Sequence, residues 1–175
     1  MFARHFIDSL DFARKGLELR GDAAISEMPR LQDVLAGPDG QVSYVLRGLP
    51  GKDGEAMLEL RLEGNCQLRC QRCLQRLPYT IKTVSLLMPV PGSELEGSLP
   101  ESGELEEEDT VDRIPADAHM DVLSLVEDEI LLGLPLSPRH EFGACEAAVE
   151  GVSPAQQGGN QKQNPFAVLR GLKDK

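Results

Sequence analysis

The 175-residue chain has no tryptophan, and its aromatic residues make up only 4% of the sequence. So few aromatic side chains argue against a surface on which nucleic-acid bases stack, and they leave the core to Leu, Val, Ile and Ala. Basic residues are also scarce, because 18 Lys and Arg stand against 29 Asp and Glu, for a formal net charge of -11. A uniform coating of nucleic acid is therefore disfavoured, and any phosphate contact has to come from a local basic patch.

Long apolar runs are absent as well. Asp8 interrupts the first apolar stretch before it reaches the length of a signal peptide, and nowhere are there as many as about 18 consecutive apolar residues. We therefore expect a cytoplasmic protein with no contact to a membrane. The length suits one domain with a substantial core.

Cysteine is too sparse for a disulfide scaffold, since the chain has only four. Three of them, Cys66, Cys70 and Cys73, crowd together in the sequence. In a reducing compartment such clustering indicates metal or thiol chemistry rather than structural bridges.

Apolar periodicity predicts an α+β fold. Alternation predicts half-buried strands around residues 42–46 and 58–70, with a third strand over about residues 80–90. The last two would form an antiparallel hairpin with the cysteines at its tip, in a sheet whose closure into a barrel the pattern leaves open.

Three flanking helices are predicted. The first covers residues 7–19 loosely, and the second begins at an N-cap, Ser26, and ends at Gly37. The third covers residues 122–134, where apolar residues recur every three or four positions. Asp121 would cap this helix.

Composition divides the chain into three parts. Residues 1–145 are expected to form a single α+β domain that contains a mobile acidic loop at about residues 92–112, because that stretch has nine acids and no base. Residues 146–163 are polar and rich in Gly and Gln, which indicates a flexible linker. Residues 164–175 are expected to form a short, tethered C-terminal helix motif.

The C-terminal motif has the pattern of a helix that binds a partner. Asn164 would be its N-cap and Pro165 its first residue, while Phe166, Leu169 and Leu172 form an apolar stripe. About ten residues cannot hold a helix alone in water, so this helix has to dock. We expect these five residues to bind a partner, and docking on the chain's own domain is the alternative.

The strongest local signal for chemistry is the pair Cys70 and Cys73, because two thiolates separated by two residues can chelate one tetrahedral ion from a tight turn. His140 and Cys145, downstream of the third helix, could complete a Cys3His zinc site. Two alternatives stay open: a turn with an ordinary surface histidine, and a dithiol redox pair. For Cys66, which shares the register of the apolar strand, core packing is the preferred interpretation.

Charge is unevenly distributed around these cysteines. Residues 64–93 contain no acid, yet they include four cations, with Arg139 able to join them if its loop docks there. Arginine forks suit phosphates, so this patch is a candidate RNA contact, with solvated charge on a hairpin as the alternative. The four cations are Arg69, Arg72, Arg76 and Lys82.

The run Glu127, Asp128 and Glu129 lies in the middle of the third predicted helix. We expect these acids to form a solvated face, with pairing to the basic patch as the alternative. No nucleophile with a general base, phosphate-cradling loop or pair of catalytic carboxylates is recognisable. We therefore expect no enzymatic activity and no small-molecule substrate.

Four motifs, taken in order, resemble those of the YceD family, the bacterial large ribosomal RNA subunit accumulation proteins. They are Leu-Arg-Cys-Gln-Arg-Cys at residues 68–73, the helix and return at residues 122–140, Cys145, and Asn-Pro-Phe-Ala-Val-Leu at residues 164–169. The resemblance implies a non-enzymatic cytosolic factor for the synthesis, processing or stability of 23S rRNA. It places the family's cysteine pair on Cys70 and Cys73 and its acidic motif on residues 127–129.

The leading hypothesis is thus a ribosome-biogenesis factor whose partner is 23S rRNA or a pre-large-subunit ribosomal protein. One alternative is an acidic adaptor that binds a ribosomal protein without touching RNA, which the net charge favours. A second alternative is a CxxC thiol oxidoreductase, which would need an exposed thiolate of low pKa at Cys70 or Cys73.

Overall fold

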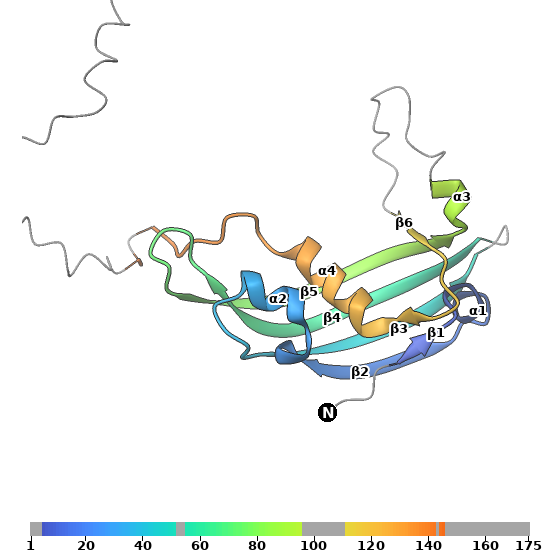
Figure 1. Ribbon diagram of the computed structural model, residues 1–175, viewed down its shortest axis with the longest axis horizontal. Helices are drawn as coiled ribbons and strands as arrows, with labels where there is room; N and C mark the ends of the chain where they lie inside the picture. The colour runs from blue at the N-terminus through green and yellow to red at the C-terminus, as the bar shows by residue number, and fades with distance from the viewer. Residues whose placement is uncertain (1–4, 52–54, 96–110, 143, 146–175) are drawn as a thin grey trace, which may run out of the picture. The chain divides into compact units, whose positions relative to one another are not determined.

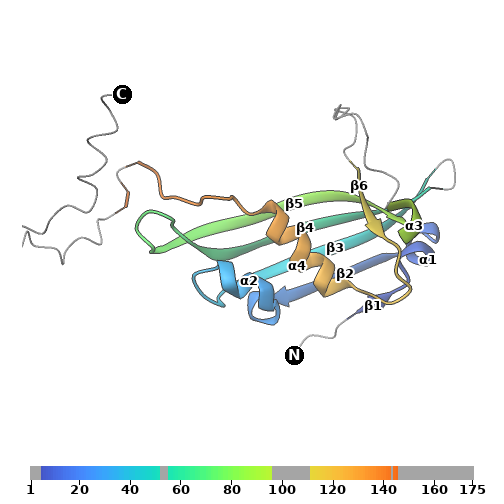
Figure 2. The same cartoon turned by 45° about the horizontal axis from the view of Figure 1, so that its top comes forward.

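The computed structural model describes residues 5–51, 55–95, 111–142 and 144–145. Within these ranges α2 (Pro29–Val34) and α4 (Val122–Gly133) lie on one face of a five-stranded sheet (Figures 1 and 2). The elements in chain order are β1 (Phe6–Ile7), α1 (Ser9–Arg14), β2 (Glu18–Ala24), η1 (Ile25–Glu27), α2 (Pro29–Val34), β3 (Gln41–Pro50), β4 (Ala56–Arg69), β5 (Arg76–Val90), α3 (Gly92–Leu95), β6 (Val111–Pro115), β7 (Met120–Asp121) and α4 (Val122–Gly133).

The sheet has the order β2-β3-β4-β5-β6. Its first four strands pair antiparallel, β5 and β6 pair parallel, and β1 pairs with β7 in a separate two-stranded sheet. The α+β class is confirmed, and the sheet is open, because β2 and β6 are its two edges. The sequence analysis predicted neither edge strand, because their short segments have little alternation of apolar and polar residues.

The two central strands follow the predicted alternation. In β4, Leu58, Leu60 and Leu62 are buried, whereas Arg61 and Glu63 between and beyond them face solvent. Strand β5 begins at Arg76, earlier than predicted, and pairs antiparallel with β4 from Arg76 to Leu87. One face of the sheet is therefore apolar and covered, and the other is polar and open.

Two of the predicted helices are shorter than expected. The first is confined to α1, because the chain enters strand β2 at Glu18. Ser26 is not an N-cap: it lies in η1, and α2 begins only at Pro29, after Met28, whose side chain makes no capping hydrogen bond. At Gly48, where α1 packs on β3, an added Cβ would lie 2.4 Å from the carbonyl oxygen of Phe12, so only glycine permits this approach.

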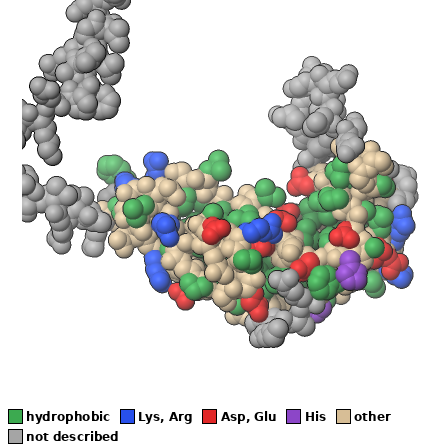
Figure 3. Space-filling view, in the orientation of Figure 1, with side chains coloured by type: hydrophobic (Ala, Val, Ile, Leu, Met, Phe, Trp, Pro, Cys, Tyr) green, Lys and Arg blue, Asp and Glu red, His purple; other side chains and the backbone are tan. Residues whose placement is uncertain are grey.

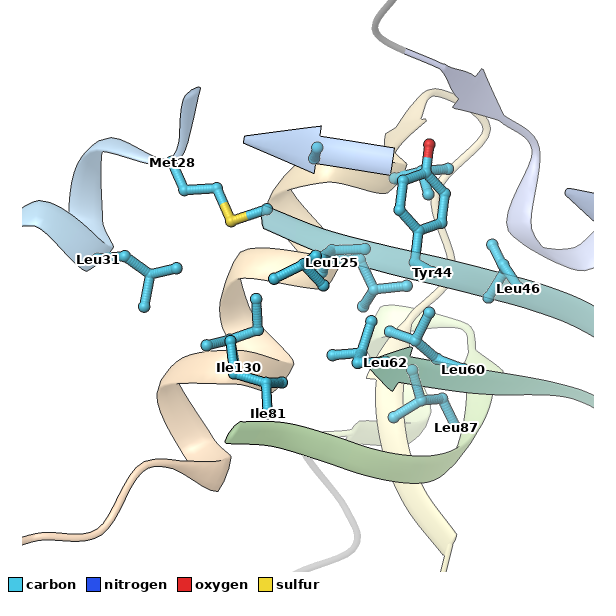
Figure 4. Packing of buried hydrophobic residues seen from close by; sticks show 14 of the residues in the cluster. Met28, Leu31, Tyr44, Leu46, Leu60, Leu62, Ile81, Leu87, Leu125 and Ile130 are labelled. Carbon is cyan, nitrogen blue, oxygen red and sulfur yellow. The ribbon is translucent and has the colours of Figure 1, made fainter. Parts of the chain in front are cut away.

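Helix α4 is the main cover of the apolar face. As predicted, Asp121 caps it by accepting a hydrogen bond from the amide of Leu123 at 3.0 Å. Its buried residues Leu125 and Ile130 point toward the sheet side chains Leu62 and Ile81, as Figure 4 shows. This packing fixes the end of α4, from which the chain continues to His140.

Two of the three acids of α4 are buried, which overturns the expectation of a solvated face. Glu127 accepts hydrogen bonds from the amides of Arg30 at 2.6 Å and Leu31 at 3.1 Å, and its other oxygen binds the guanidinium of Arg30 at 3.0 Å. It therefore caps the first turn of α2 from another helix. Glu129 accepts a hydrogen bond from the hydroxyl of Ser85 on β5. Neither acid pairs with the basic patch.

Several expectations concern residues outside the described ranges. Of the expected acidic loop, Gly92–Leu95 forms α3 and Val111 begins β6, while residues 96–110 are not described. The expected linker and C-terminal helix motif, at residues 146–163 and 164–175, also lie outside. Among the described helices, none is both long and apolar enough to cross a membrane.

Candidate metal centre

The β4–β5 hairpin positions the first two sulfur atoms. Its strands stay paired as far as Arg69 and Arg76, and the turn between them is closed by hydrogen bonds from Cys70 N to Gln75 O at 3.0 Å and from Leu74 N to Cys70 O at 2.9 Å. Leu74 has a φ of 62°, the left-handed conformation that costs a non-glycine residue about 1–2 kcal/mol. The turn thus accepts backbone strain directly after Cys73.

The segment that follows α4 brings the other two side chains to this turn. The amide of Gln71 donates to the carbonyl of Pro138 at 2.9 Å, so the returning chain is attached to the hairpin tip. His140 and Cys145 follow Pro138 along this segment. The segment after α4 therefore runs against the turn that carries Cys70 and Cys73.

The ligand atoms of Cys70, Cys73, His140 and Cys145 all lie within 4.8 Å of one another, so these residues form a group that could hold a metal ion. We call them the Cys3His cluster. The two sulfur atoms of Cys70 and Cys145 are 3.6 Å apart, and the Nδ1 of His140 lies 3.4 Å from the Cys73 sulfur and 3.6 Å from that of Cys145. Bonds of about 2.0–2.3 Å to a tetrahedral zinc ion place ligand atoms roughly 3.5–3.8 Å apart, so these three distances are close to those of a zinc site.

Both ring nitrogens of His140 have partners that orient the ring for binding a metal ion. Its Nδ1 faces the sulfur atoms, while its Nε2 lies 3.1 Å from the carbonyl oxygen of Arg76. A proton on Nε2 that is donated to this carbonyl leaves the Nδ1 lone pair free for a metal ion. Metal-binding histidines almost always have such an outer partner.

Hydrogen bonds stabilise negative charge on two sulfur atoms of the cluster, those of Cys70 and Cys145. The pKa of the Cys70 thiol falls to about 5, first because the amide of Cys73 donates to its sulfur and also because the amides of His140 and Arg72 do so, against the opposing effect of burial. Burial acts to raise the pKa of Cys145, but hydrogen bonds, led by that of Arg72, lower it overall. The pKa of His140 is raised by its bonds to Cys70 and then Cys145. Thiolates are the form that binds metal.

Cys66 stays out of the cluster. It is 1% exposed and belongs to the hydrophobic core, as its register predicts. Burial raises the pKa of its thiol to about 11, so it behaves as an inert apolar side chain.

The structure divides the predicted basic patch. Arg69 and Arg76 lie opposite each other on the open face of the sheet, and Lys82 lies on the same face, six residues along β5 and opposite Glu63. Arg76 also binds Asp39 at 3.1 Å. Arg72, in contrast, is turned toward the cluster: its Nε lies 3.0 Å from the sulfur of Cys145. In Figure 3, Lys and Arg side chains are more frequent than Asp and Glu side chains at the hairpin end.

The YceD family model, described as "Large ribosomal RNA subunit accumulation protein YceD", matches residues 58–173. The protein of that name from Haemophilus influenzae is 30% identical over 175 residues, which cover 97% of this chain and 95% of the relative. The chain belongs to the YceD family. No solved structure was found to match it. The matched range in this YceD family member contains the whole Cys3His cluster.

Chemically, four protein ligands fill the positions around a tetrahedral ion and leave none open for a substrate or water. Such closed sites are structural, whereas catalytic zinc sites keep one position free. The geometry is less suited to a dithiol redox role, because the cysteines lie between two strands rather than at the start of a helix and Cys70 is fully buried.

Beside the cluster lies a hollow of about 360 Å³ between the end of α2, the end of β4 and the segment after α4. Most of its lining is apolar, and Leu136 at its margin is fully exposed. The lining residues are Asp33, Val34, Leu68, Arg69, Gln71, Leu131, Leu134, Pro135, Leu136 and Pro138.

Proposed function

We propose that this protein is a non-enzymatic factor of the cytoplasm that supports the synthesis, processing or stability of 23S rRNA during assembly of the large ribosomal subunit. Membership of the YceD family, whose description names the accumulation of large ribosomal subunit RNA, supports this role. The observation that carries the proposal is a basic hairpin tip, free of acids over residues 64–93, that adjoins a Cys3His cluster.

Zinc is the metal that best fits the cluster. Three thiolates and one imidazole in tetrahedral spacing are a soft donor set, which favours Zn²⁺ over the hard ions Mg²⁺ and Ca²⁺. Cys70, Cys73, His140 and Cys145 would hold the ion, which would link the return segment to the hairpin tip. The ion would thereby keep the arginines of the tip in place.

The RNA contact would come from the open face of the hairpin. Arg69 and Arg76 are exposed and adjacent across the two strands, so their guanidinium groups can reach neighbouring phosphates. Lys82 extends this surface along β5, about 20 Å away at roughly 3.3 Å per residue. No aromatic platform is required, because binding to phosphates depends on charge.

A triple variant tests this contact. Changing Arg69, Arg76 and Lys82 to Gln is expected to weaken binding to purified large-subunit rRNA and to reduce the slope of log K against log salt by about 2–3, since each lost phosphate contact removes about 0.7–0.9. Filter binding over a range of salt concentrations measures both quantities. The matched control changes three arginines to Gln on the same face of the sheet, where they pair with Glu18 and Glu59. They are Arg20, Arg47 and Arg61.

An acidic adaptor that binds a ribosomal protein is the alternative function. The net charge of -11 favours a basic protein partner, and the apolar hollow beside the cluster offers surface for one. If the triple variant binds rRNA with unchanged affinity and salt slope, the adaptor replaces the RNA-contact proposal.

We expect the C-terminal motif to recognise a partner. Deleting residues 164–175 should reduce 23S rRNA accumulation in cells and leave the melting temperature of the protein unchanged. Changing Phe166 and Leu169 to Ser should reproduce the defect, whereas changing Asp174 and Lys175 to Ser, at positions off the apolar stripe of the expected helix, should not. A fall of several degrees, which corresponds to a loss of about 1–2 kcal/mol, would show instead that the motif stabilises the protein itself.

A further inference from the structure

Arg72 occupies an unusual place for a residue of a basic RNA-binding tip. It stands between the two cysteines of the turn, and its guanidinium makes two contacts with the return segment. Its Nε donates to the sulfur of Cys145 at 3.0 Å, and its Nη2 donates to the carbonyl of Glu141 at 3.3 Å. Both contacts join parts of the chain that are about seventy residues apart in sequence.

These contacts matter because the other described partners of the Cys145 sulfur are themselves members of the Cys3His cluster. The hairpin also holds the return segment at Pro138, through the amide of Gln71, and at His140, whose Nε2 lies 3.1 Å from the carbonyl oxygen of Arg76. Within the final turn the amide of Ala144 bonds to the carbonyl of Glu141. Arg72 is the side chain of the hairpin that contacts both ends of this turn, because its guanidinium binds the carbonyl of Glu141 and the sulfur of Cys145. Without it, the turn that carries Cys145 would have more conformations to lose when a metal ion binds.

Charge gives a second reason. Three thiolates and one neutral imidazole around a divalent ion have a net charge of -1. The guanidinium of Arg72 is in direct contact with one of those thiolates, so it compensates this charge where it arises. The guanidinium of Arg76, by comparison, binds the carboxylate of Asp39.

We propose that Arg72 is a positioning residue of the metal centre, which holds Cys145 for metal binding and balances the charge of the site, rather than a contact to RNA. This inference rests on the proposed metal site. The cations of the hairpin then have two different roles. Arg72 holds a ligand of the metal cluster, and Arg69 contacts RNA phosphates.

The test compares R72Q, R72K and R69Q in the full-length protein. Zinc affinity is measured by competition with a chelator, and the sulfur-to-metal charge-transfer absorption of the Co²⁺-loaded protein reports the thiolate ligands. R72Q is expected to bind zinc about 10–100-fold more weakly, the usual loss for an outer-shell partner. R72K should recover part of the affinity, because lysine keeps the charge but not the planar fork. R69Q should bind zinc like the wild type.

RNA binding separates the two tasks. In saturating zinc, R72Q should bind purified large-subunit rRNA within about twofold of the wild type, whereas R69Q should bind it more weakly. The proposal is overturned if R72Q retains wild-type zinc affinity and Co²⁺ spectrum, or if zinc-saturated R72Q loses as much RNA affinity as R69Q. A wild-type protein that binds neither metal would refute the metal site itself, which is a different and recognisable result.

Discussion

Cys73→Ser is expected to leave the purified protein without stoichiometric zinc, whereas the wild type should hold one ion per chain. The sulfur of Cys73 lies 3.4 Å from the Nδ1 of His140, inside the Cys3His cluster, and a hydroxyl is a far poorer ligand than a thiolate. The loss of affinity should exceed about 100-fold, because outer-shell partners alone contribute about 10–100-fold. Elemental mass spectrometry of native protein measures the zinc content.

Cys66→Ser is the matched control. The chemical change is identical, but the sulfur of Cys66 is buried in the core and is not one of the four ligands. This variant should keep its zinc and lose about 1–3 kcal/mol of stability, because a hydroxyl replaces an apolar group in the interior. A Cys73→Ser protein that retains one zinc ion would contradict the assignment of the ligands.

Glu127→Ala is expected to lower the free energy of unfolding by about 2–4 kcal/mol, since hydrogen bonds to charged groups contribute about 1.5–3 kcal/mol each. The change removes the acceptor for two amides at the start of α2, one of which, that of Leu31, is buried. It also leaves Arg30 without its buried partner. Urea unfolding at a fixed zinc concentration measures the difference.

Asp128→Ala provides the comparison for Glu127, because Asp128 binds the same arginine from a half-exposed position. An exposed ion pair contributes little, so this variant should stay within about 1 kcal/mol of the wild type. Equal losses for the two variants would show that Glu127 acts only through Arg30 and does not cap α2.

The sequence predicted the parts of the fold that depend on local patterns. Alternation identified β3 and β4, and Asp121 followed by apolar residues every three or four positions identified α4. Residue chemistry also named the four members of the Cys3His cluster, because soft ligands in two spaced pairs are few in this chain. That these residues bind zinc stays a prediction.

Other features depend on partners distant in sequence and could not be predicted. The start of α2 is capped by Glu127, 97 residues away in the sequence. The prediction of Ser26 as the N-cap was wrong because only a nearby residue could be considered. The same contact buries Glu127, an acid that the sequence analysis expects on a solvated face. Arg72 was grouped with the other cations because nothing in the sequence shows that its guanidinium turns toward Cys145.

Crosslinking in living cells tests the central claim, that a basic hairpin adjoining a metal centre contacts large-subunit rRNA. Ultraviolet crosslinking of the tagged full-length protein, followed by sequencing of the attached RNA, should recover 23S rRNA, with far fewer reads for the variant in which Arg69, Arg76 and Lys82 are Gln. The control variant at Arg20, Arg47 and Arg61 should crosslink like the wild type. Recovery of no 23S rRNA above background, or equal recovery from the wild type and both variants, would contradict the account.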